Sequence, residues 1–445
     1  MGQLFGTDGI RGRANTYPMT CDMAMKTGRA VGMLTLEAGH TSVVIGRDTR
    51  ISGGMLEAAL AAGIASVGVD ALLAGVIPTP GVAYLSTVIE TAGAGIVISA
   101  SHNPYYDNGI KIFRRGGLKL SDAQEAKLES FILEEEDVPR GEVGVISEIT
   151  DGCERYADFL LGKFPVRKPG EKLNLIIDAA NGAASGCVGL VFNPDLFDVQ
   201  FIHNEPDGIN INNNCGSQHT EALADLVRKN KADAGLAFDG DADRLIAVDD
   251  TGREITGDRI LAICANYSKS QGRLHNNIVV STIMSNIGLV NALNSLGIDH
   301  EITDVGDRKV LERMQETGAT IGGEDSGHMI FLADHTTGDG MLTALKLLEV
   351  MAATGQPLSR LADIMTVYPQ ILMNVEVDAS RPDFTKIPGI ADAIAGVEKH
   401  LGDQGRVLVR YSGTQPLLRV MVEGPEEEVT RESCERICQA IRDNM

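Results

Sequence analysis

Residues 43–54 read V-V-I-G-R-D-T-R-I-S-G-G, an apolar run that ends abruptly in a polar, glycine-containing loop. An Ala/Leu-rich stretch of helical character follows, and then a second apolar strand that ends in the loop V-I-P-T-P at residues 76–80. Strand, loop, helix and strand in this order are the signature of a βαβ unit in an α/β layer fold. The stretch therefore predicts an α/β domain in this part of the chain.

The same order of elements recurs after residue 175, which begins L-I-I, and again after residue 278, which begins I-V-V. Each of the three units then reaches a short strand that ends in its own motif. These motifs are S-A-S-H-N-P (99–104), D-G-D-A-D-R (239–244) and G-G-E-D-S-G-H (322–328). Ligands of open α/β sheets bind beyond the carboxyl ends of strands, so three similar domains could direct these loops to one cleft. Many α/β chains look repetitive at this level, and the repeat alone does not establish a triplication.

The pattern changes after about residue 366, where short strands alternate with turns and the chain finishes in an amphipathic helix. We therefore predict an α/β fold with three similar mixed-sheet domains and a smaller C-terminal α+β domain. The expected domains are 1–150, 151–253, 254–366 and 367–445. The first carries the serine motif, the second the aspartate motif, the third the G-G-E-D-S-G-H motif and the fourth an arginine-rich loop.

The composition, with 43% apolar and 22% charged residues, is that of a soluble globular protein. A net charge of −22 argues against nucleic acid and membrane partners, and it requires any phosphate-binding site to be locally basic. Seven cysteines without a C-x-x-C pair predict reduced thiols in a cytoplasmic protein. The longest apolar stretch, residues 58–69, is too short to span a bilayer, and we expect no signal peptide.

The strongest chemical signal is the aspartate motif, in which Asp239, Asp241 and Asp243 alternate within one turn. At roughly 5 Å and an effective dielectric of about 20, each pair of such carboxylates costs about 3 kcal/mol. The apolar strand before them predicts a partly buried loop, where uncompensated charge is still more costly. A hard cation such as Mg²⁺ would relieve this repulsion, whereas a Ca²⁺ loop of the EF-hand type does not fit, because Arg244 stands where glycine is needed.

Ser101 ends an apolar strand and precedes His102, Asn103 and Pro104. On its own, S-H-N-P is more often a simple turn, but a serine at a strand end beside a metal loop could carry a phosphoryl group. Because His102 is adjacent in sequence, we expect its side chain to point away from the serine hydroxyl.

Two further loops offer groups that suit a sugar phosphate. Residues 324–328, E-D-S-G-H, present acceptors and donors for sugar hydroxyls, although polar glycine turns are common. Residues 410–415, R-Y-S-G-T-Q, with Arg419 beyond them, combine guanidinium groups, hydroxyls and a glycine turn, which is phosphate-binding chemistry. A surface hairpin with incidental arginines is the alternative for this segment.

Together these motifs resemble the α-D-phosphohexomutase superfamily, and most closely its bacterial branch that acts on glucosamine phosphates. The resemblance covers essentially the whole chain. It also includes F-G-T-D-G-I-R-G (5–12), G-R-D-T-R-I-S-G (46–53), V-G-D-R (305–308), T-T-G-D-G (336–340) and R-Y-S-G-T-Q-P-L-L-R-V-M-V-E-G (410–424).

The resemblance implies a heart-shaped enzyme with a central cleft, an isomerase that interconverts glucosamine 6-phosphate and glucosamine 1-phosphate for cell-wall precursor synthesis. It implies that Ser101 is the phosphoserine, that its phosphate and the aspartates at 239, 241 and 243 bind one Mg²⁺ per chain, and that a sugar bisphosphate is both intermediate and activating phosphoryl donor. The expected partner is a phosphosugar substrate, with no nucleic acid and no membrane, and the resemblance also suggests a homodimer.

The remaining roles are likewise implied by the resemblance. Glu324 and Ser326 would hold sugar hydroxyls, and Arg244 would neutralise the moving phosphoryl group. Arg11, Lys111 and His328 match basic residues around the reacting groups, and Lys111 could serve in acid/base exchange. The phosphate that is not transferred would be held by Arg410, Ser412, Gly413, Thr414 and Arg419.

Three alternatives stay open. Gln415 stands where the glucosamine branch usually has Glu, so a phosphomannomutase or phosphoglucomutase acting on mannose or glucose phosphates remains possible. A phosphatase with Asp239 as nucleophile is disfavoured, because Asp243 occupies a position where that class needs Thr or Val. A non-catalytic cation-binding protein would leave Ser101 and the arginine loop unexplained.

Overall fold

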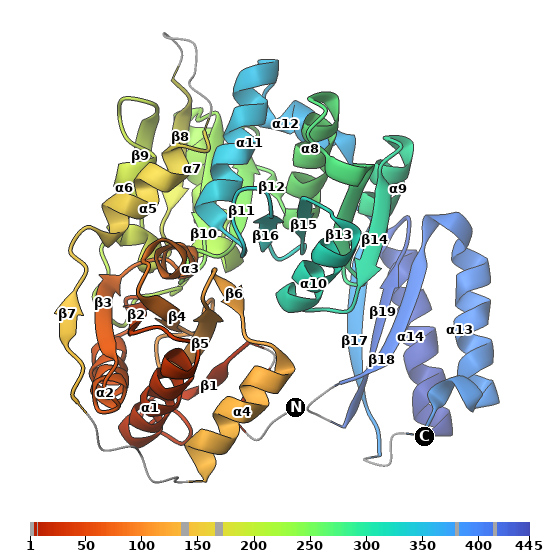
Figure 1. Cartoon of the computed structure of the whole chain (residues 1–445). Helices are drawn as coiled ribbons and strands as arrows, with labels where there is room; N and C mark the ends of the chain where they lie inside the picture. The colour runs from red at the N-terminus through yellow and green to blue at the C-terminus, as the bar shows by residue number, and fades with distance from the viewer. Residues whose placement is uncertain (1–3, 7, 135–141, 165–171, 379–381, 413–415) are drawn as a thin grey trace. The chain divides into compact units, whose positions relative to one another are not determined.

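The computed structural model describes residues 4–6, 8–134, 142–164, 172–378, 382–412 and 416–445 (Figure 1). The chain divides into two compact units. The first consists of Met1–Ile283 and Asp299–Asp363, and the second of Met284–Ile298 and Ile364–Met445.

The first unit begins with a mixed sheet in the order β1-β5-β4-β2-β3-β7, with β6 paired to β5. Its strands are β1 (Ile10–Arg13), β2 (Ser42–Arg47), β3 (Asp70–Val76), β4 (Ala92–Ile98), β5 (Asp107–Arg114), β6 (Leu118–Lys119) and β7 (Ile146–Glu148). Strand β2 runs parallel to β3 and β4, whereas β4 and β5 are antiparallel. The apolar runs of β2 and β4 are buried along almost their whole length, as expected for central strands covered on both faces.

Helices α1 (Cys21–Glu37) and α2 (Gly53–Ala65) pack closely against each other beside this sheet. A Cβ atom on Gly28 of α1 would lie 2.3 Å from the carbonyl oxygen of Leu60. A Cβ atom on Gly63 of α2 would lie 2.2 Å from the carbonyl oxygen of Met25. The two glycines therefore allow the helix backbones to approach each other more closely than any side chain would permit. Helices α3 (Thr79–Val88) and α4 (Asp122–Leu133) complete this part of the chain.

Two further sheets of the first unit repeat the same plan in yellow-green and in green to teal (Figure 1). One has the order β12-β11-β10-β8-β9 and the other β14-β13-β15-β16. Their strands are β8 (Asn174–Asp178), β9 (Asp198–Ile202), β10 (Ala234–Phe238), β11 (Leu245–Asp249), β12 (Glu254–Ile255), β13 (Ile278–Thr282), β14 (Asp299–Thr303), β15 (Ile321–Gly323) and β16 (Met329–Phe331). Their helices are α5 (Gly152–Leu161), α6 (Val188–Val191), α7 (Glu221–Asn230), α8 (Gly257–Ser270), α10 (Asp307–Thr317), α11 (Gly340–Thr354) and α12 (Leu358–Leu361).

The three sheets share one topological feature that places the motifs. In each, the parallel strands lead into a turn to an antiparallel strand, from β4 to β5, from β10 to β11 and from β15 to β16. The motifs S-A-S-H-N-P, D-G-D-A-D-R and E-D-S-G-H occupy these three turns. The mixed α/β sheets predicted from the sequence are thus observed, and the expected repetition extends to the turns that carry the polar residues.

The second unit is built on an antiparallel sheet in the order β17-β19-β18. Its elements are α9 (Ile287–Ser295), β17 (Gln370–Glu376), α13 (Pro388–Leu401), β18 (Arg406–Tyr411), β19 (Leu417–Glu423) and α14 (Glu427–Asn444). Helix α14 is amphipathic as expected, because Cys434, Ile437, Cys438 and Ile441 form one buried stripe against the sheet.

Residues 284–298 are a finding that the sequence did not predict. They lie within the expected third domain but belong to the second compact unit. Arg406 donates to the carbonyl oxygen of Ser285 at 2.7 Å, and the backbone N–H of Tyr368 donates to Asn286 Oδ1 at 3.0 Å. The four expected domain boundaries and the heart-shaped outline with a central cleft stay predictions.

Candidate active site

Ser101 lies in the turn between β4 and β5. Its backbone has a φ of 53°, a left-handed conformation that residues other than glycine rarely adopt. The residue is only 1% exposed, and its hydroxyl donates a hydrogen bond to Asp239 Oδ2 at 2.6 Å. The serine turn and the aspartate turn, which are far apart in the sequence, therefore meet in the first unit.

The aspartate turn brings three carboxylates together between β10 and β11. One oxygen from each of Asp239, Asp241 and Asp243 lies within 4.8 Å of the others, and all three residues are buried. Ala242 between them has a φ of 56°, so the backbone curls tightly and turns the alternate side chains inward. Thr79, at the start of α3, donates to Asp241 Oδ2 at 2.6 Å and helps to fix this carboxylate.

Lys111 is the nearest cation to the aspartates. It reaches back from β5, and its Nζ atom lies 2.8 Å from Asp241 Oδ2 and 3.3 Å from Asp243 Oδ2. The same atom lies 3.2 Å from Asp8 Oδ2, and Arg11 donates to that oxygen at 2.7 Å. Lys111 and Arg11 thus share Asp8, which orients both cations beside the serine turn.

Burial and neighbouring charges together shift the pKa values of these groups. Burial raises the pKa of Asp239 well above its usual range, and the charges of Asp243 and Asp241 add to this effect. Burial also opposes ionisation of Asp243, but Lys111 and His328 outweigh it and hold the pKa of Asp243 well below its usual range. For Lys111, burial lowers the pKa, yet Asp241 and Asp8 outweigh burial, so the pKa stands well above its ordinary value and the ammonium is retained.

The donor set of this turn fits a hard cation such as Mg²⁺. All its ligand atoms are carboxylate oxygens, which are the ligands such cations prefer. Among the residues that the structure describes, the buried Oδ1 atoms of Asp241 and Asp243 have no hydrogen-bond partner. Buried carboxylate oxygens without donors are costly, and a bound cation would satisfy them.

The third turn supplies His328, Glu324 and Ser326. His328 Nδ1 lies 3.6 Å from Asp243 Oδ2, so this turn also reaches the aspartates. Glu324 Oε1 accepts a hydrogen bond from the backbone N–H of Gly306 at 3.1 Å. The Ser326 hydroxyl is buried and has no partner within the described part of the chain, which leaves it available to a ligand.

Arg244 completes the cluster in the first unit. It follows the aspartates directly, and its Nε atom lies 3.7 Å from Asp243 Oδ1. That Nε atom is buried without a hydrogen-bond partner among the residues that the structure describes. The backbone of Arg244 also forms an isolated antiparallel bridge with His328, which links the second and third turns.

The expectation for His102 was wrong. Its Nδ1 atom lies 3.4 Å from the hydroxyl of Ser101 rather than pointing away from it. The left-handed backbone at Ser101 turns consecutive side chains toward the same side, which the alternation of an extended strand would not do. Burial lowers the pKa of His102 to about 4, and the nearby charges of Arg244 and Arg11 act in the same direction, so the imidazole is neutral.

The expected phosphate loop lies in the second unit. Arg410 of β18 and Arg419 of β19 are directly opposite each other in the antiparallel ladder. Like charges in such a pair repel, and an anion between them would relieve the repulsion. The Nε atom of Arg419 is buried with no hydrogen-bond partner in the described residues, and Ser412 is buried at the end of β18. Gly413 and Thr414 lie outside the described residues.

Several residues of the first-unit cluster were missed by sequence reasoning. Asp307 Oδ2 lies 3.5 Å from His328 Nε2 and also contacts Lys119, which in turn contacts Asp8. Asp8 and Asp307 stand inside the quoted motifs F-G-T-D-G-I-R-G and V-G-D-R, so a signal existed for them. Lys119 has no such signal, because it is a single lysine on a short strand.

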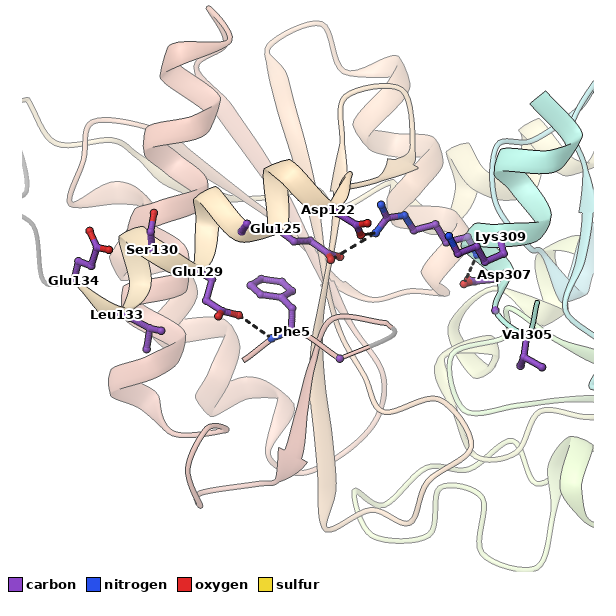
Figure 2. A pocket seen from close by; sticks show the side chains of 14 residues that line it. Phe5, Asp122, Glu125, Glu129, Ser130, Leu133, Glu134, Val305, Asp307 and Lys309 are labelled. Carbon is purple, nitrogen blue, oxygen red and sulfur yellow. Dashed lines mark hydrogen bonds and ion pairs between the residues drawn. The ribbon is translucent and has the colours of Figure 1, made fainter. Parts of the chain in front are cut away.

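A cavity of about 760 Å³ opens beside Asp307 (Figure 2). It lies between α4 and the start of α10. On one wall, Glu129 Oε2 accepts a hydrogen bond from the backbone N–H of Phe5 at 3.2 Å. On another, Arg308 Nη1 forms an ion pair with Asp122 Oδ1 at 2.7 Å. Asp307 belongs both to this wall and to the cluster around His328, so the cavity adjoins the reacting groups.

Comparison with known proteins gives a consistent result along the whole chain. Four models for the domains of phosphoglucomutase/phosphomannomutase match in order. Alpha/beta/alpha domain I matches residues 2–139, domain II 154–252, domain III 256–368 and the C-terminal domain 372–440. Among the described residues, no helix is long and apolar enough to cross a membrane.

Relatives with curated names agree with the domain models. The chain is 59% identical to a phosphoglucosamine mutase of Desulforapulum autotrophicum and 52% identical to one of Syntrophobacter fumaroxidans, with 99% of both chains covered in each case. Among solved structures, a phosphoglucomutase/phosphomannomutase family protein of Burkholderia thailandensis is 23% identical with a TM-score of 0.80, over 98% of this chain and 96% of that one. A protein described as a putative phosphomannomutase of Thermus thermophilus is also 23% identical, with a TM-score of 0.78 and 98% of both chains covered.

These matches confirm the predicted fold class and the resemblance to the phosphohexomutases, since they span the chain from its first domain to its last. The chain belongs to the phosphoglucomutase/phosphomannomutase family and is an isomerase of the phosphomutase type.

Proposed function

We propose that this enzyme interconverts glucosamine 6-phosphate and glucosamine 1-phosphate through a phosphoserine and a bisphosphorylated sugar. The curated relatives at 52–59% identity, which carry the name phosphoglucosamine mutase, support the choice of sugar. The observation that carries the chemistry is the 2.6 Å contact between the Ser101 hydroxyl and Asp239 within the buried aspartate cluster.

Ser101 is suited to carry the phosphoryl group. Its hydroxyl stands at the meeting point of two turns, and Lys111, Arg11 and Arg244 lie in the same cluster. These cations offset the charge of a phosphate on a protein whose net charge is −22. A water-excluding surround also protects the phosphoserine from hydrolysis, and the burial of Ser101 supports this role.

We propose that Asp239, Asp241 and Asp243 hold one Mg²⁺ together with the phosphoserine. The ion would supply charge neutralisation on the phosphoryl oxygens during transfer. Arg244 would contact the same oxygens from the protein side, since its Nε atom is buried and has no partner among the described residues.

Lys111 is the proposed proton carrier. It keeps its proton in this arrangement because Asp241 and Asp8 surround it, so it can donate to the departing oxygen of Ser101 when the phosphoryl group leaves. In the second transfer, the Ser101 hydroxyl would attack the phosphoryl group and return its proton to Lys111. Over the two transfers, the proton lost by the attacking sugar hydroxyl is matched by the proton taken up by the departing sugar oxygen. Arg11 and His328 would stabilise the charge that develops around these steps.

The sugar would be held by Glu324 and Ser326, with its distal phosphate on the loop that contains Arg410, Ser412, Gly413, Thr414 and Arg419. The opposed pair Arg410 and Arg419 supports phosphate binding in the second unit. A mutase must hold the bisphosphate in two orientations, and a loop that contacts only phosphate oxygens serves both. A sugar bisphosphate would also be the activating donor that first phosphorylates Ser101.

The test of the carrier role is phosphopeptide mass analysis of purified protein together with the variant Ser101→Ala. We expect phosphate on Ser101 and less than about 1% of the wild-type turnover in the variant, because no other group can replace the ester oxygen. Phosphate on an aspartate in trapped intermediates would instead indicate a phosphatase with Asp239 as nucleophile.

The test of the sugar is a comparison of kcat/KM for glucosamine, glucose and mannose 6-phosphates at one Mg²⁺ concentration. We expect the amino sugar to be preferred. A preference for mannose or glucose would favour the phosphomannomutase/phosphoglucomutase alternative and leave the phosphoserine chemistry intact.

The last two proposals concern the location of the protein in the cell and its oligomeric state. We propose a cytoplasmic location, which agrees with seven cysteines that are free thiols in the structure. We also propose a homodimer, which analytical ultracentrifugation would test.

A further inference from the structure

The turn that carries Ser101 has backbone carbonyl groups that need hydrogen-bond donors from outside the turn. Ser101 has a φ of 53°, and no backbone N–H within the described residues donates to the carbonyl oxygens of Ser101 or Asn103. Buried carbonyl groups without donors are costly, and a left-handed serine adds strain. Other side chains must therefore satisfy the turn.

Arg50 supplies most of the hydrogen-bond donors that the carbonyl groups of this turn need. Its side chain is fully buried, and its Nη2 atom donates to the carbonyl oxygens of Ser101 at 2.9 Å and Asn103 at 2.8 Å. Its Nη1 atom donates to the carbonyl oxygens of Pro104 and Asp107, the latter at 3.1 Å. Four of the five guanidinium donors thus go to one turn, and only an arginine has a rigid fork that can do this.

The fifth donor closes a ring of contacts around the serine. Arg50 Nε donates to Asp48 Oδ2 at 2.8 Å, and the Ser99 hydroxyl donates to the same oxygen at 2.6 Å. The Ser99 oxygen in turn accepts the backbone N–H of Ser101 at 3.0 Å. Both the N–H and the C=O of Ser101 are therefore fixed by the Asp48 and Arg50 pair.

Asn212 contacts the same carbonyl oxygens from another part of the first unit. Its Nδ2 atom donates to Ser101 at 2.9 Å and to Asn103 at 3.1 Å. A Cβ atom on Gly240, within the aspartate turn, would lie 2.5 Å from the Ser101 carbonyl oxygen and 2.8 Å from Asn212 Nδ2. Asn212, Gly240 and the serine turn are thus packed without space between them.

We propose that Arg50 and Asn212 are positioning residues for phosphoryl transfer, with Arg50 setting the conformation of the serine turn and Asn212 setting its distance from the aspartates. The proposal rests on Ser101 being the phosphoryl carrier. Transfer needs the reacting atoms held to a fraction of an ångström, and a misplacement of about 1 Å can cost roughly 100-fold in rate. Neither residue touches the substrate in this scheme.

The sharpest test uses Asn212, because it is only partly buried, whereas Arg50 is fully buried. The variants are Asn212→Ala and the isosteric Asn212→Asp, whose carboxylate would oppose two carbonyl oxygens. The matched control is Asn214→Ala, which removes the same amide from an exposed residue whose φ of 53° is close to the 57° of Asn212. The readouts are kcat, KM, melting temperature and the single-turnover rate of phosphoryl transfer from phosphorylated enzyme.

We expect kcat and the single-turnover rate to fall by roughly 10- to 100-fold in Asn212→Ala and further in Asn212→Asp. KM should stay close to that of the control, and both variants should remain folded at the assay temperature because Arg50 still donates to both carbonyl oxygens. A purely structural role would lower the amount of folded enzyme and leave the single-turnover rate of the folded fraction unchanged. A transfer rate within twofold of the control in both variants would overturn the proposal. Wild-type enzyme with no phosphate on Ser101 would overturn the proposed function itself, so the two failures are distinguishable.

Arg50 has its own matched pair within the motif G-R-D-T-R. Arg50→Lys keeps the charge beside Asp48 but loses the fork, whereas Arg47→Lys changes an arginine that pairs with Glu57 at 3.1 Å. We expect the first variant to acquire phosphate on Ser101 from a sugar bisphosphate at least about tenfold more slowly than the second. Equal rates in two folded variants would contradict the role assigned to Arg50.

Discussion

At the scale of single residues, several buried polar groups of the site lack a hydrogen-bond partner that a substrate or cation would supply. Asp241 and Asp243 each have one satisfied and one unsatisfied carboxylate oxygen, and Arg244 has a buried Nε atom without a partner in the described part of the chain. Ser326 shows the same incompleteness. Such groups are unfavourable in the free protein, so ligand binding is the natural explanation for their retention.

Asp307 is the residue for which we predict a change in sugar preference. It lies on the wall of the cavity of about 760 Å³, and it contacts His328 and Lys119. Burial raises the pKa of Asp307, but Lys119 and His328 outweigh burial and keep this pKa below its ordinary value, so the carboxylate is ionised. An ionised carboxylate at this place would favour a sugar that bears an ammonium group.

We expect Asp307→Asn to lower kcat/KM for glucosamine 6-phosphate relative to glucose 6-phosphate by about tenfold, the equivalent of one charge-assisted hydrogen bond. The measurement is the ratio of the two kcat/KM values, and Asp304→Asn on the same loop is the control. An unchanged ratio with a general loss of activity would assign Asp307 to the support of Lys119 and His328 instead.

A site residue could be predicted from the sequence only where it stands in a recognisable pattern. Ser101 and the aspartates could be predicted because they end apolar strands in polar clusters. Asn212 could not, because a single asparagine in a polar loop has no pattern that distinguishes it from its neighbours. The direction of His102 was wrong because a left-handed φ at Ser101 cannot be read from residue types alone.

At the scale of elements, the repeated hairpin explains why three distant motifs have equivalent places. Strand periodicity predicted that the motifs follow strands, and the structure adds that each fills the turn into an antiparallel strand. The packing of residues 284–298 with the second unit was not predictable, because it depends on non-local contacts such as Arg406 to Ser285.

The contact between α1 and α2 gives a prediction for stability. We expect Gly63→Ala to reduce the free energy of unfolding by about 1–3 kcal/mol, because its Cβ atom would lie 2.2 Å from the Met25 carbonyl oxygen and the helices must separate. Gly54→Ala on the same helix is the matched control, since a Cβ atom there meets nothing within 4 Å. Chemical denaturation measures both, and equal stabilities would show that the two helices part without cost.

The pair formed by Asp178 at the end of β8 and His203 just after β9 predicts a pH dependence of stability. A hydrogen bond to Asp178 at 2.9 Å raises the pKa of His203 above its ordinary 6.5, and partial burial offsets only part of this effect. Because the folded value is the higher one, the stabilisation is complete below about pH 6.5 and is lost as pH rises through the folded value.

We therefore expect the difference in melting temperature between wild type and His203→Gln to shrink between about pH 6 and pH 9. His219→Gln, which removes an exposed histidine from the same part of the chain, is the control. A difference that stays constant over this range would mean that the contact with Asp178 does not depend on the charge of the imidazole.

At the scale of the whole molecule, the proposed roles are divided between the two compact units. The first contains the serine, the aspartates and the E-D-S-G-H turn, and the second contains Arg410, Ser412 and Arg419. Sequence motifs could assign these groups to one reaction, but they hold no information about the distance between units. This division separates the chemical step from the holding of the distal phosphate.

That separation predicts how Arg419 acts. Its guanidinium belongs to the second unit and lies opposite Arg410, so it would contact the phosphate that is not transferred, in the ground state and the transition state alike. Interactions of equal strength in both states change KM rather than kcat. We expect Arg419→Ala to raise KM about tenfold or more, as for loss of a charge-assisted hydrogen bond, with a smaller change in kcat. Arg431→Ala, which removes an exposed arginine paired with Glu427, is the control. A fall in kcat at unchanged KM would place Arg419 among the groups that act on the transferring phosphoryl group, and the division of labour between the units would then be wrong.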